Sequence, residues 1–427
     1  MPKKKTALTI EERLQQALVP AEEQPYEVPE NWVWVRLTNI ISLSTGKKDA
    51  NYGSDKGVYP FFTCASEPIA CNDYSFDGES ILVPGNGANV GLVIYYNGKF
   101  EAYQRTYVIQ KSKFNIKFIY YNMLAFWDEH NRNKQYGSAT NYIKLGNFES
   151  YNIALPPLSE QQRIVERIEE LFAKLDEAKE RLQEVVDSFA VRKAAILHKA
   201  FTGELTKQWR LENGVSDESW EEKKFSEVAV IKSNLVSPFD YLDYPHIAPD
   251  SIEKFTGRLL SYRTIREDNV KSPKHLFYKG QILYSKIRPY LSKAIIADVD
   301  GLCSADMYPI EALCNTKYLL KYMLSTEFLE QSTTAGSRSL LPKINQKELS
   351  SISVPLPTLP EQHEIVRLID DLLARERAAQ QAAEQALASI ELMKKSILAR
   401  AFRGELGTNK ASEASALELL KQVLAEG

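Results

Sequence analysis

The chain of 427 residues lacks the features that mark several large classes of protein. It has no apolar run of about 18 residues, the length that a membrane-spanning helix needs. The basic start at residues 1–5 is not followed by the apolar core of a signal peptide. Its four cysteines, Cys64, Cys71, Cys303 and Cys314, form no Cys-x-x-Cys pair, so we interpret them as buried thiols rather than as a zinc site or disulfide framework. We expect a cytoplasmic protein that does not enter a membrane.

Motifs that carry catalysis or hold a cofactor are also missing. The chain has no Walker loop, His-Glu-x-x-His pair, nucleophile elbow or calcium-binding loop, and its five histidines show no catalytic spacing. Residues 85–91 resemble a phosphate-binding glycine loop, but Val90 stands where the third glycine belongs, which favours a tight turn. We predict that the chain is non-catalytic, with no metal and no cofactor of its own.

The overall charge argues mildly against a nucleic-acid-binding protein. The net charge is −3 and the pI is about 6.1, whereas nucleic-acid-binding domains are often basic. Much of the negative charge falls in one segment, which contains Glu160, Glu166, Glu169, Glu170, Asp176, Glu177 and Glu180. The local distribution of charge is therefore more informative than the total.

What the sequence does contain is a long internal repeat. The sequence Leu-Pro-Pro-Leu-Ser-Glu-Gln-Gln-Arg-Ile-Val at residues 155–165 returns as Leu-Pro-Thr-Leu-Pro-Glu-Gln-His-Glu-Ile-Val at 356–366. The register then holds without a gap to Ala-Phe-Thr-Gly-Glu-Leu at 200–205 and Ala-Phe-Arg-Gly-Glu-Leu at 401–406. This offset of 201 residues is far longer than the roughly 20–50 residues of a solenoid repeat, so it indicates duplicated domains.

Two blocks of the chain, residues 31–157 and 220–358, have the composition of globular α+β domains. Both are rich in Tyr, Phe, Ile, Val, Gly and Asn, and short alternating apolar runs predict strands. Helices are expected within them over 116–127 and 316–331. The two blocks also align with each other, so each is a copy of one domain.

The repeated segments that follow the blocks predict two long helices. Their apolar residues recur in alternating steps of four and three, which is the heptad pattern of a coiled coil. The predicted seam comprises Ile164, Ile168, Leu171, Leu175, Leu182, Val185 and Phe189 in the first helix, and Ile365, Ile369, Leu372, Ala379, Ala383, Ala386 and Ile390 in the second. Because both seams are long, match in length and belong to one chain, we expect an antiparallel intramolecular pair. The alternative is that each helix packs on its own globular domain.

The predicted fold class is therefore α+β, with two duplicated domains separated by two long helices in a pseudo-twofold arrangement. The expected segments are an N-terminal lead-in with a short helix (1–30), a first globular domain (31–157), a first spacer helix (158–206), a linker (207–219), a second globular domain (220–358), a second spacer helix (359–406) and a C-terminal tail with a short helix (407–427).

Basic, amide and aromatic side chains cluster in predicted loops of both domains. Arg and Lys, with Asn and Gln, are the side chains that read base edges, and Ser, Thr and Tyr bind phosphates. The candidates for DNA binding are Lys47, Lys48, Tyr52, Lys56, Arg132, Lys134, Tyr136, Ser138, Thr140, Asn141 and Tyr142 in the first domain, and Arg258, Tyr262, Arg263, Arg266, Lys271, Lys274, Lys286, Arg288, Ser337, Arg338 and Lys343 in the second. Each taken alone also fits a solvated surface, so the hypothesis rests on their clustering in both copies.

The complete pattern resembles the specificity subunits of type I restriction-modification enzymes. The resemblance is carried by residues 155–165 and 200–205, by their second copies, and by the lead-in at 18–32. It implies two target recognition domains held apart by an antiparallel coiled coil, which bind a bipartite site in double-stranded DNA. It also implies two methyltransferase subunits and motor/nuclease subunits as partners. S-adenosylmethionine, ATP and Mg would then belong to those partners.

Two other interpretations remain open on the sequence. The chain also fits the recognition subunit of a methylation-only or type II system, which would bind DNA in the same way. A coiled-coil adaptor that bridges proteins without touching DNA is a more distant alternative. Binding to a mixed DNA library at low salt distinguishes the adaptor from both recognition subunits.

The second domain contains an insertion of about thirteen residues, which gives the first testable prediction. Trp32 aligns with Trp220 at an offset of 188, but later residues align at 201, so the extra residues lie between Val228 and Ile282. If this cation-rich segment contacts DNA, replacing Arg263 and Arg266 by Ala removes binding energy from one half-site. An arginine that reads guanine contributes about 1–3 kcal/mol of base discrimination.

The expected result is weaker binding of the assembled complex, with the loss confined to the half-site of the second domain. Competition against targets altered in either half measures this. Unchanged affinity and salt dependence would show that the insertion faces solvent or a protein partner.

Overall fold

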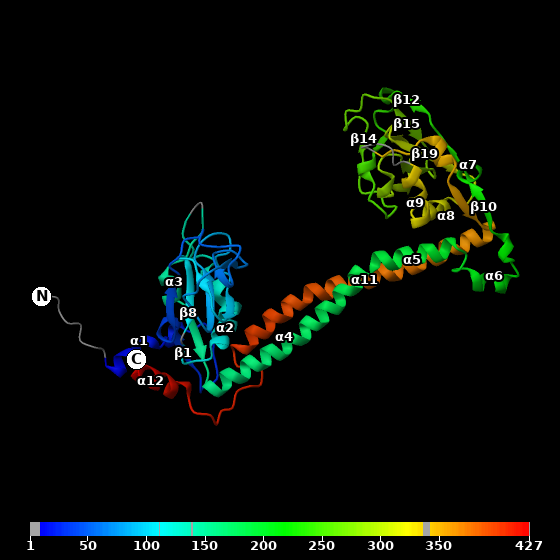
Figure 1. Ribbon diagram of the computed structural model, residues 1–427. Coiled ribbons are helices and arrows are strands. Elements are labelled where there is room, and N and C mark those ends of the chain that lie inside the picture. Colours follow the sequence, from blue (N-terminus) through cyan, green and yellow to red (C-terminus); the bar gives the residue numbers. More distant parts are fainter. Residues whose placement is uncertain (1–8, 111, 138–139, 336–341, 427) are drawn as a thin grey trace. The chain divides into compact units, whose positions relative to one another are not determined.

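The computed structural model describes residues 9–110, 112–137, 140–335 and 342–426. The chain divides into two compact units, unit 1 with residues 1–181 and 386–427 and unit 2 with residues 182–385. Two long helices, α4 (Leu158–Asp187) and α11 (Leu359–Ala401), contribute residues to both units (Figure 1). Each unit therefore combines one globular domain with part of the helical pair. Within the described residues, no helix is both long and apolar enough to cross a membrane.

The globular domain of unit 1 contains three small sheets. An antiparallel pair, β1 (Val33–Arg36) with β9 (Asn152–Leu155), lies where the domain leads into α4. The main sheet has the order β2 (Ser42–Thr45), β8 (Thr106–Gln110), β5 (Glu79–Pro84), β6 (Ile94–Asn97), and the third has the order β4 (Ile69–Cys71), β3 (Tyr59–Phe62), β7 (Glu101–Ala102). The helices α2 (Ile116–Asn131) and α3 (Leu145–Glu149) complete the domain, and buried side chains of α2, β1, β5 and β9 form one core with the start of α4.

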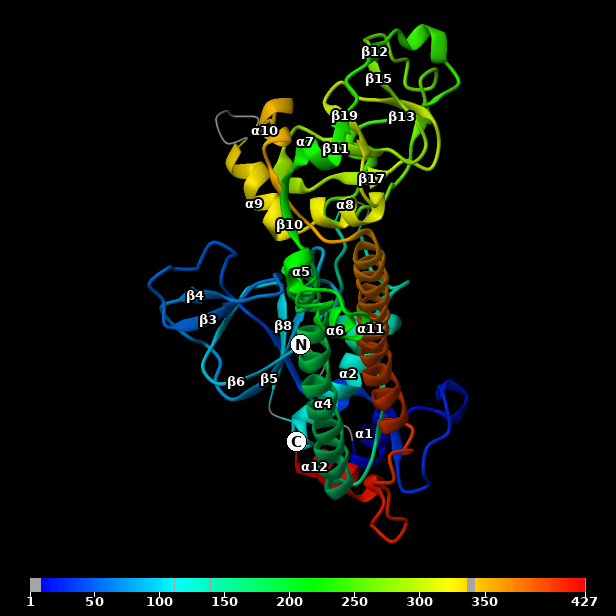
Figure 2. The same ribbon diagram turned by 90° about the vertical axis from the view of Figure 1, so that its right-hand side faces the viewer.

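Unit 2 repeats this plan with additions. The strand pair is β10 (Glu221–Lys224) with β20 (Ser353–Leu356). The main sheet has the order β11 (Ala229–Ile231), β19 (Met307–Ala312), β16 (Ile282–Ser285), β17 (Ala294–Ile296). The third sheet has the order β12 (Leu235–Val236), β15 (Lys274–Phe277), β18 (Gly301–Cys303), β13 (Pro245–Ile247), β14 (Arg263–Thr264). The helices are α7 (Phe225–Val228), α8 (Thr316–Met323), α9 (Thr326–Ala335) and α10 (Gln346–Ser350). Within the unit, β12 and β15 lie at the end of the domain opposite α8 (Figure 2).

This architecture confirms the predicted α+β fold, corrects one detail of it and locates the insertion more closely. The single helix expected over 316–331 is divided into α8 and α9, because the chain turns at Leu324 and Ser325. The insertion falls mainly in the β13–β14 connection, which spans 248–262, whereas the corresponding β3–β4 connection spans only 63–68.

The long helices pair in antiparallel directions. In unit 1, Asp176 pairs with Lys394 at 2.5 Å and Lys179 pairs with Glu391 at 2.8 Å. In unit 2, Arg192 of α5 (Phe189–Phe201) pairs with Glu376 at 2.6 Å. As the residue number rises along the first helix it falls along the second, which is the register of an antiparallel pair.

The first helix is not continuous, because it breaks at Ser188 between α4 and α5. The carbonyl oxygen of Val185 accepts hydrogen bonds from the Ser188 hydroxyl at 3.0 Å and from Arg192 Nη2 at 3.3 Å. Side chains that hydrogen-bond to a carbonyl within a helix compete with the backbone ladder and bend the helix. The predicted spacer of 158–206 is thus two helices in sequence.

The burial of the predicted seam follows the heptad pattern except at two positions. Ile164, Ile168, Ile365, Ile369, Ala383 and Ile390 are buried, and Leu171, Leu175, Leu182, Phe189, Leu372 and Ala386 are half-buried. Val185 and Ala379, in contrast, are exposed, and their neighbours Val186 and Gln380 are the half-buried residues. The prediction was wrong at these two positions. It placed a step of three residues before a step of four, whereas in the structure the step of four comes first, so the inward residue lies one position later in the chain.

The strongest part of the sequence repeat forms a buried junction between each domain and its helix. In unit 1, Trp32 Nε1 donates to Glu160 Oε2 at 2.9 Å, and in unit 2 Trp220 Nε1 donates to Glu361 Oε1 at 3.1 Å. Both carboxylates are fully buried. The adjacent glutamine, Gln161 in unit 1, accepts from the backbone N–H of Asn115 and donates to the Pro156 carbonyl, both at 2.9 Å.

The first and last described helices pack together within unit 1. Helix α12 (Ala416–Glu426) packs beside α1 (Ile10–Ala17), and Arg13 Nη1 donates to the Leu424 carbonyl at 3.2 Å. Arg163 forms two hydrogen bonds of 2.8 Å with Glu413. The C-terminal tail is therefore part of the first unit rather than a free linker.

The buried ion pair of unit 2 gives a stability prediction. Arg210, on α6 (Lys207–Asn213), lies 2.6 Å from Glu361 and is only 6% exposed. Replacing Arg210 by Met leaves the Glu361 carboxylate buried without its cation. We expect the free energy of unfolding to fall by about 3–5 kcal/mol, as for other buried pairs that lose one partner.

Chemical denaturation of the full chain measures the effect. The matched control is Lys179→Met, which removes an exposed ion pair and should leave the unfolding midpoint nearly unchanged. Equal shifts for the two variants would contradict a stabilising role of the buried pair.

Candidate nucleic-acid interface

Three loops of the first domain meet at one end of the main sheet. They are the loop after β5 (85–91), the turn before β8 (103–106) and the segment that follows α2 (132–144). Backbone hydrogen bonds join them: Gly85 N–H donates to the Arg105 carbonyl at 2.9 Å, and Ile143 N–H donates to the Gly85 carbonyl at 2.9 Å. Gly87 N–H donates to the Asn141 carbonyl at 2.8 Å. These hydrogen bonds fix the backbone of the three loops where they meet.

The second domain repeats the same hydrogen bonds at an offset of 201 residues. Lys286 N–H donates to the Asp306 carbonyl at 3.0 Å, and Ile344 N–H donates to the Lys286 carbonyl at 2.9 Å. Arg288 N–H donates to the Pro342 carbonyl at 2.8 Å. The two domains thus share one backbone frame at this end, although the side chains on it differ. We call the frame in each domain the loop frame.

Aromatic and cationic side chains cover the loop frame of unit 1. Tyr136 and Tyr142 stack with ring centroids 5.6 Å apart, and Lys144 Nζ lies 4.3 Å from the Tyr136 centroid. Lys48 Nζ lies 4.1 Å from the centroid of Tyr52, and this contact raises the pKa of Lys48, so the ammonium stays charged at neutral pH. Ammonium groups beside aromatic rings suit a surface that meets phosphates and bases.

The β2–β3 connection approaches the loop frame through a glycine. A Cβ atom at Gly46 would lie 1.8 Å from the carbonyl oxygen of Ala102, so no larger residue fits without a backbone shift. Two residues further on, the Lys48 carbonyl accepts from the N–H of Gln104 at 2.9 Å. This contact places Lys48 beside the turn before β8.

The structure brings only part of the predicted first-domain set together. Lys47, Lys48, Tyr52 and Lys56 lie in the β2–β3 connection, Tyr136, Thr140, Asn141 and Tyr142 lie in the third loop, and Ser138 is outside the described residues. Arg132 and Lys134 instead face α2, where Arg132 lies 4.0 Å from Asp128 and Lys134 lies 3.4 Å from the His130 ring. Both residues therefore already have partners on α2.

Several predicted cations of the second domain already have partners. Arg258 pairs with Glu253 at 3.5 Å, Arg266 Nη2 with Asp243 at 3.0 Å, and Lys343 with Asp306 at 3.1 Å. Lys274 donates a hydrogen bond to Ser272, and Lys286 lies over the Tyr308 ring. Ser337 and Arg338 lie outside the described residues. Within the described part of the predicted second-domain set, the exposed side chains with neither a hydrogen bond nor an ion pair are Tyr262, Arg263, Lys271 and Arg288.

Known proteins share this organisation. The family described as "Type I restriction modification DNA specificity domain" matches residues 29–187 and 217–386. The first match covers one globular domain and all of α4, and the second covers the other domain and α11 as far as residue 386. The chain belongs to this family of type I restriction-modification specificity subunits. Its membership confirms the predicted role as a non-catalytic DNA-recognition component.

Individual relatives agree with the family assignment. The chain is 41% identical to the EcoDI specificity subunit of Escherichia coli, over 94% of this chain and 96% of that protein. It is 26% identical to the EcoBI specificity subunit of Escherichia coli, over 74% of this chain and 73% of that protein. The fold is similar to that of the HsdS subunit from Thermoanaerobacter tengcongensis, with a TM-score of 0.62, 17% identity, and coverage of 90% of this chain and all of that one.

Some residues on the loop frame could not be recognised from the sequence as candidates for DNA binding. Asn86, Gln104 and Arg105 line a cavity of about 200 Å³ with Tyr142. They were missed because Gln104 and Arg105 stand alone between two short strands, outside any cluster of basic residues. Comparison of the two copies could have identified these positions as variable, because the corresponding residues of the second domain are Ile287, Ala305 and Asp306.

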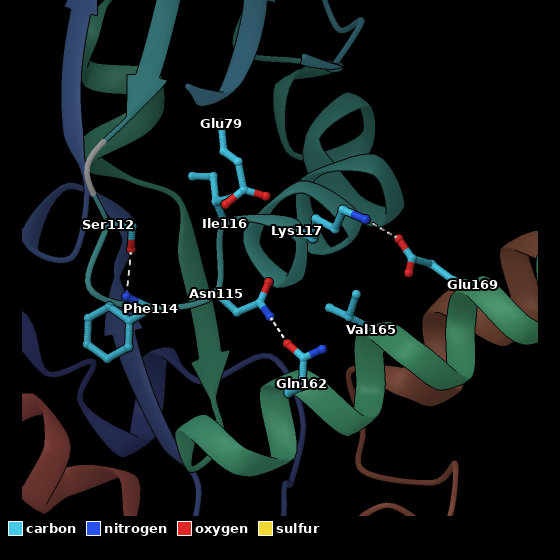
Figure 3. A pocket seen from close by; sticks show the side chains of 9 residues that line it. All are labelled: Glu79, Ser112, Phe114, Asn115, Ile116, Lys117, Gln162, Val165 and Glu169. Carbon is cyan, nitrogen blue, oxygen red and sulfur yellow. Dashed lines mark hydrogen bonds and ion pairs between the residues drawn. The ribbon is translucent and has the colours of Figure 1, made fainter. Parts of the chain in front are cut away.

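A larger cavity of about 490 Å³ lies between α2 and the start of α4 (Figure 3). Its polar side chains bond to one another: Asn115 Nδ2 donates to Gln162 Oε1 at 2.8 Å, and Lys117 pairs with Glu169 at 2.7 Å. In unit 2, Asp370, which corresponds to Glu169, pairs at 2.6 Å with Lys321 from a different position of its helix α8. These contacts hold each domain on its helix. No group of three or more metal-ligating side chains occurs in the part of the chain that the structure describes.

Proposed function

We propose that this specificity subunit binds a bipartite double-stranded DNA target, with each globular domain reading one half-site through its loop frame. The observation that carries the proposal is the pair of loop frames, which share three backbone hydrogen bonds and differ in side chains. A fixed backbone positions the loops on the DNA, and different side chains select different bases. Titration of the assembled complex against a DNA library with paired half-sites tests it.

The subunit also has the features of a scaffold for other subunits. Its two spacer segments are copies of each other, so two copies of one partner can bind them in the same way. We infer that these partners are two methyltransferase subunits, and that motor/nuclease subunits complete the complex. S-adenosylmethionine, ATP and Mg then belong to the partners, and the complex acts on DNA in the cytoplasm.

Independent reading by the two domains predicts modular specificity. Residues 220–358 are replaced by the corresponding block of another family member, which leaves the first domain and both helices unchanged. The expected outcome is a new target in which only one half-site has changed, because each loop frame is built within its own domain. Sequencing of methylated sites in cells with the hybrid subunit measures the target. A change in both half-sites would show that the domains do not read independently.

The paired helices predict a fixed spacing between the half-sites. Residues 174–180 and 390–396 face each other in the antiparallel register, and removing both sets deletes one heptad from each side of the pair. Leu182 then takes the place of Leu175, and Ile397 takes the place of Ile390, so the seam is preserved. Seven helical residues span about 10 Å, the rise of roughly 3 base pairs.

We expect the double deletion to lose affinity for the parental spacing and to prefer a different gap in a library of spacings. The matched control is deletion of 174–180 alone, which mismatches the seam and should destabilise the protein. Unchanged preference for the parental gap in the double deletion would rule out the helices as the determinant of spacing.

A further inference from the structure

We propose that Arg105 determines one guanine in the half-site of the first domain, and that the second domain has no equivalent reader because an ion pair occupies the corresponding turn. The inference rests on the proposed function and extends it to a single residue and base. It makes the two halves of the target chemically unequal, although the two domains share one fold.

Arg105 lies at the tip of a tight turn. The N–H of Thr106 donates to the Tyr103 carbonyl at 2.8 Å, which closes a β-turn with Gln104 and Arg105 at its two central positions. The neighbouring loop fixes the turn from the other side, because Gly85 N–H donates to the Arg105 carbonyl at 2.9 Å. Both central side chains are exposed. A rigid backbone therefore presents a free guanidinium at the centre of the loop frame.

Among the described residues Arg105 has no acidic partner, unlike three arginines of the candidate set. Arg132, Arg258 and Arg266 each lie beside a carboxylate. Arg105 has neither an ion pair nor a side-chain hydrogen bond within the described residues, and it lines the 200 Å³ cavity beside Asn86 and Tyr142. An arginine fork with all donors available fits the O6 and N7 acceptors of guanine in the major groove.

The surroundings of Arg105 suit a base rather than a phosphate. Gln104 Nε2 donates to Asp49 Oδ1 at 3.0 Å, which orients its amide beside the guanidinium. The carboxylate of Asp49 opposes a phosphate at this point, whereas Lys48 and Lys144, which lie over Tyr52 and Tyr136, are available to bind phosphates. Phosphate contacts from lysines together with base contacts from amide and guanidinium groups are typical of direct readout.

The corresponding turn of the second domain has different chemistry. The N–H of Met307 donates to the Ser304 carbonyl at 2.9 Å, so the turn is the same, but its central residues are Ala305 and Asp306. Asp306 accepts from Lys343 Nζ at 3.1 Å. A carboxylate accepts hydrogen bonds and cannot donate to guanine, so the second domain must read its half-site with other side chains.

The test uses the full chain assembled with its methyltransferase partners and duplexes that carry each base change in both half-sites. Arg105→Ala should lose about 5- to 150-fold of discrimination at one guanine position of the first half-site. Arg105→Lys keeps the charge but loses the fork, so it should not restore the discrimination. Thermal unfolding of the variants should match the unaltered chain, because the side chain is exposed.

Two control variants make the result specific. Arg167→Ala removes an exposed arginine of α4, outside the loop frame, and should leave discrimination unchanged. Asp306→Ala should leave every base preference of the first half-site unchanged and remove no single-base preference from the second. A lost preference in the second half-site would overturn the proposed inequality of the two turns.

The remaining outcomes also decide the question. Uniform weakening over all sequences, restored by Arg105→Lys, would show that Arg105 binds phosphate and would overturn the proposal. Unchanged binding of Arg105→Ala would place the turn outside the interface. If the unaltered complex showed no preference for any bipartite site, the proposed function itself would fail, and that measurement precedes all the variants.

Discussion

A buried carboxylate at the start of each long helix is the contact on which the rest of the structure depends. Glu160 and Glu361 are fully buried, and a buried carboxylate is costly unless hydrogen bonds satisfy it. Each accepts from a tryptophan indole of its own domain, Trp32 or Trp220. Because these partners must meet the carboxylate with good geometry, each globular domain has a defined orientation on its helix. A rigid recognition subunit needs this fixed junction.

The two junctions satisfy the same buried acid in different ways. In unit 2 the cation of Arg210 lies 2.6 Å from Glu361. In unit 1 the neutral amide of Asn409 donates to Glu160 at 2.9 Å. The second sequence repeat has no cation at the position that corresponds to Arg210. Asn409 belongs to the C-terminal tail, so the tail completes the first junction. The departure of the two repeats after residues 205 and 406 thus has a structural reason.

The loop frames of the two domains combine the same backbone arrangement with different side chains. The loop frames keep three backbone hydrogen bonds in both domains, while a Gln-Arg turn in one becomes an Ala-Asp turn in the other. Many of the acidic side chains lie instead on α4, where they pair along the helix or with α11. This separation explains how a chain with a net charge of −3 presents cationic loops.

The sequence by itself determined the features that depend on local pattern: two copies, α+β domains, heptads and antiparallel helices. Their periodicity and spacing can be recognised in the amino-acid sequence alone. Only the tertiary structure decided which charged side chains are free, because their partners are distant in sequence, as for Arg266 with Asp243 and Lys343 with Asp306. It also decided the phase of the seam at Val185 and Ala379, where steps of three and four are equally regular in the sequence and the half-buried residues are Val186 and Gln380. Arg105 was missed for the same reason, since its place beside Asn86 and Tyr142 is created by folding.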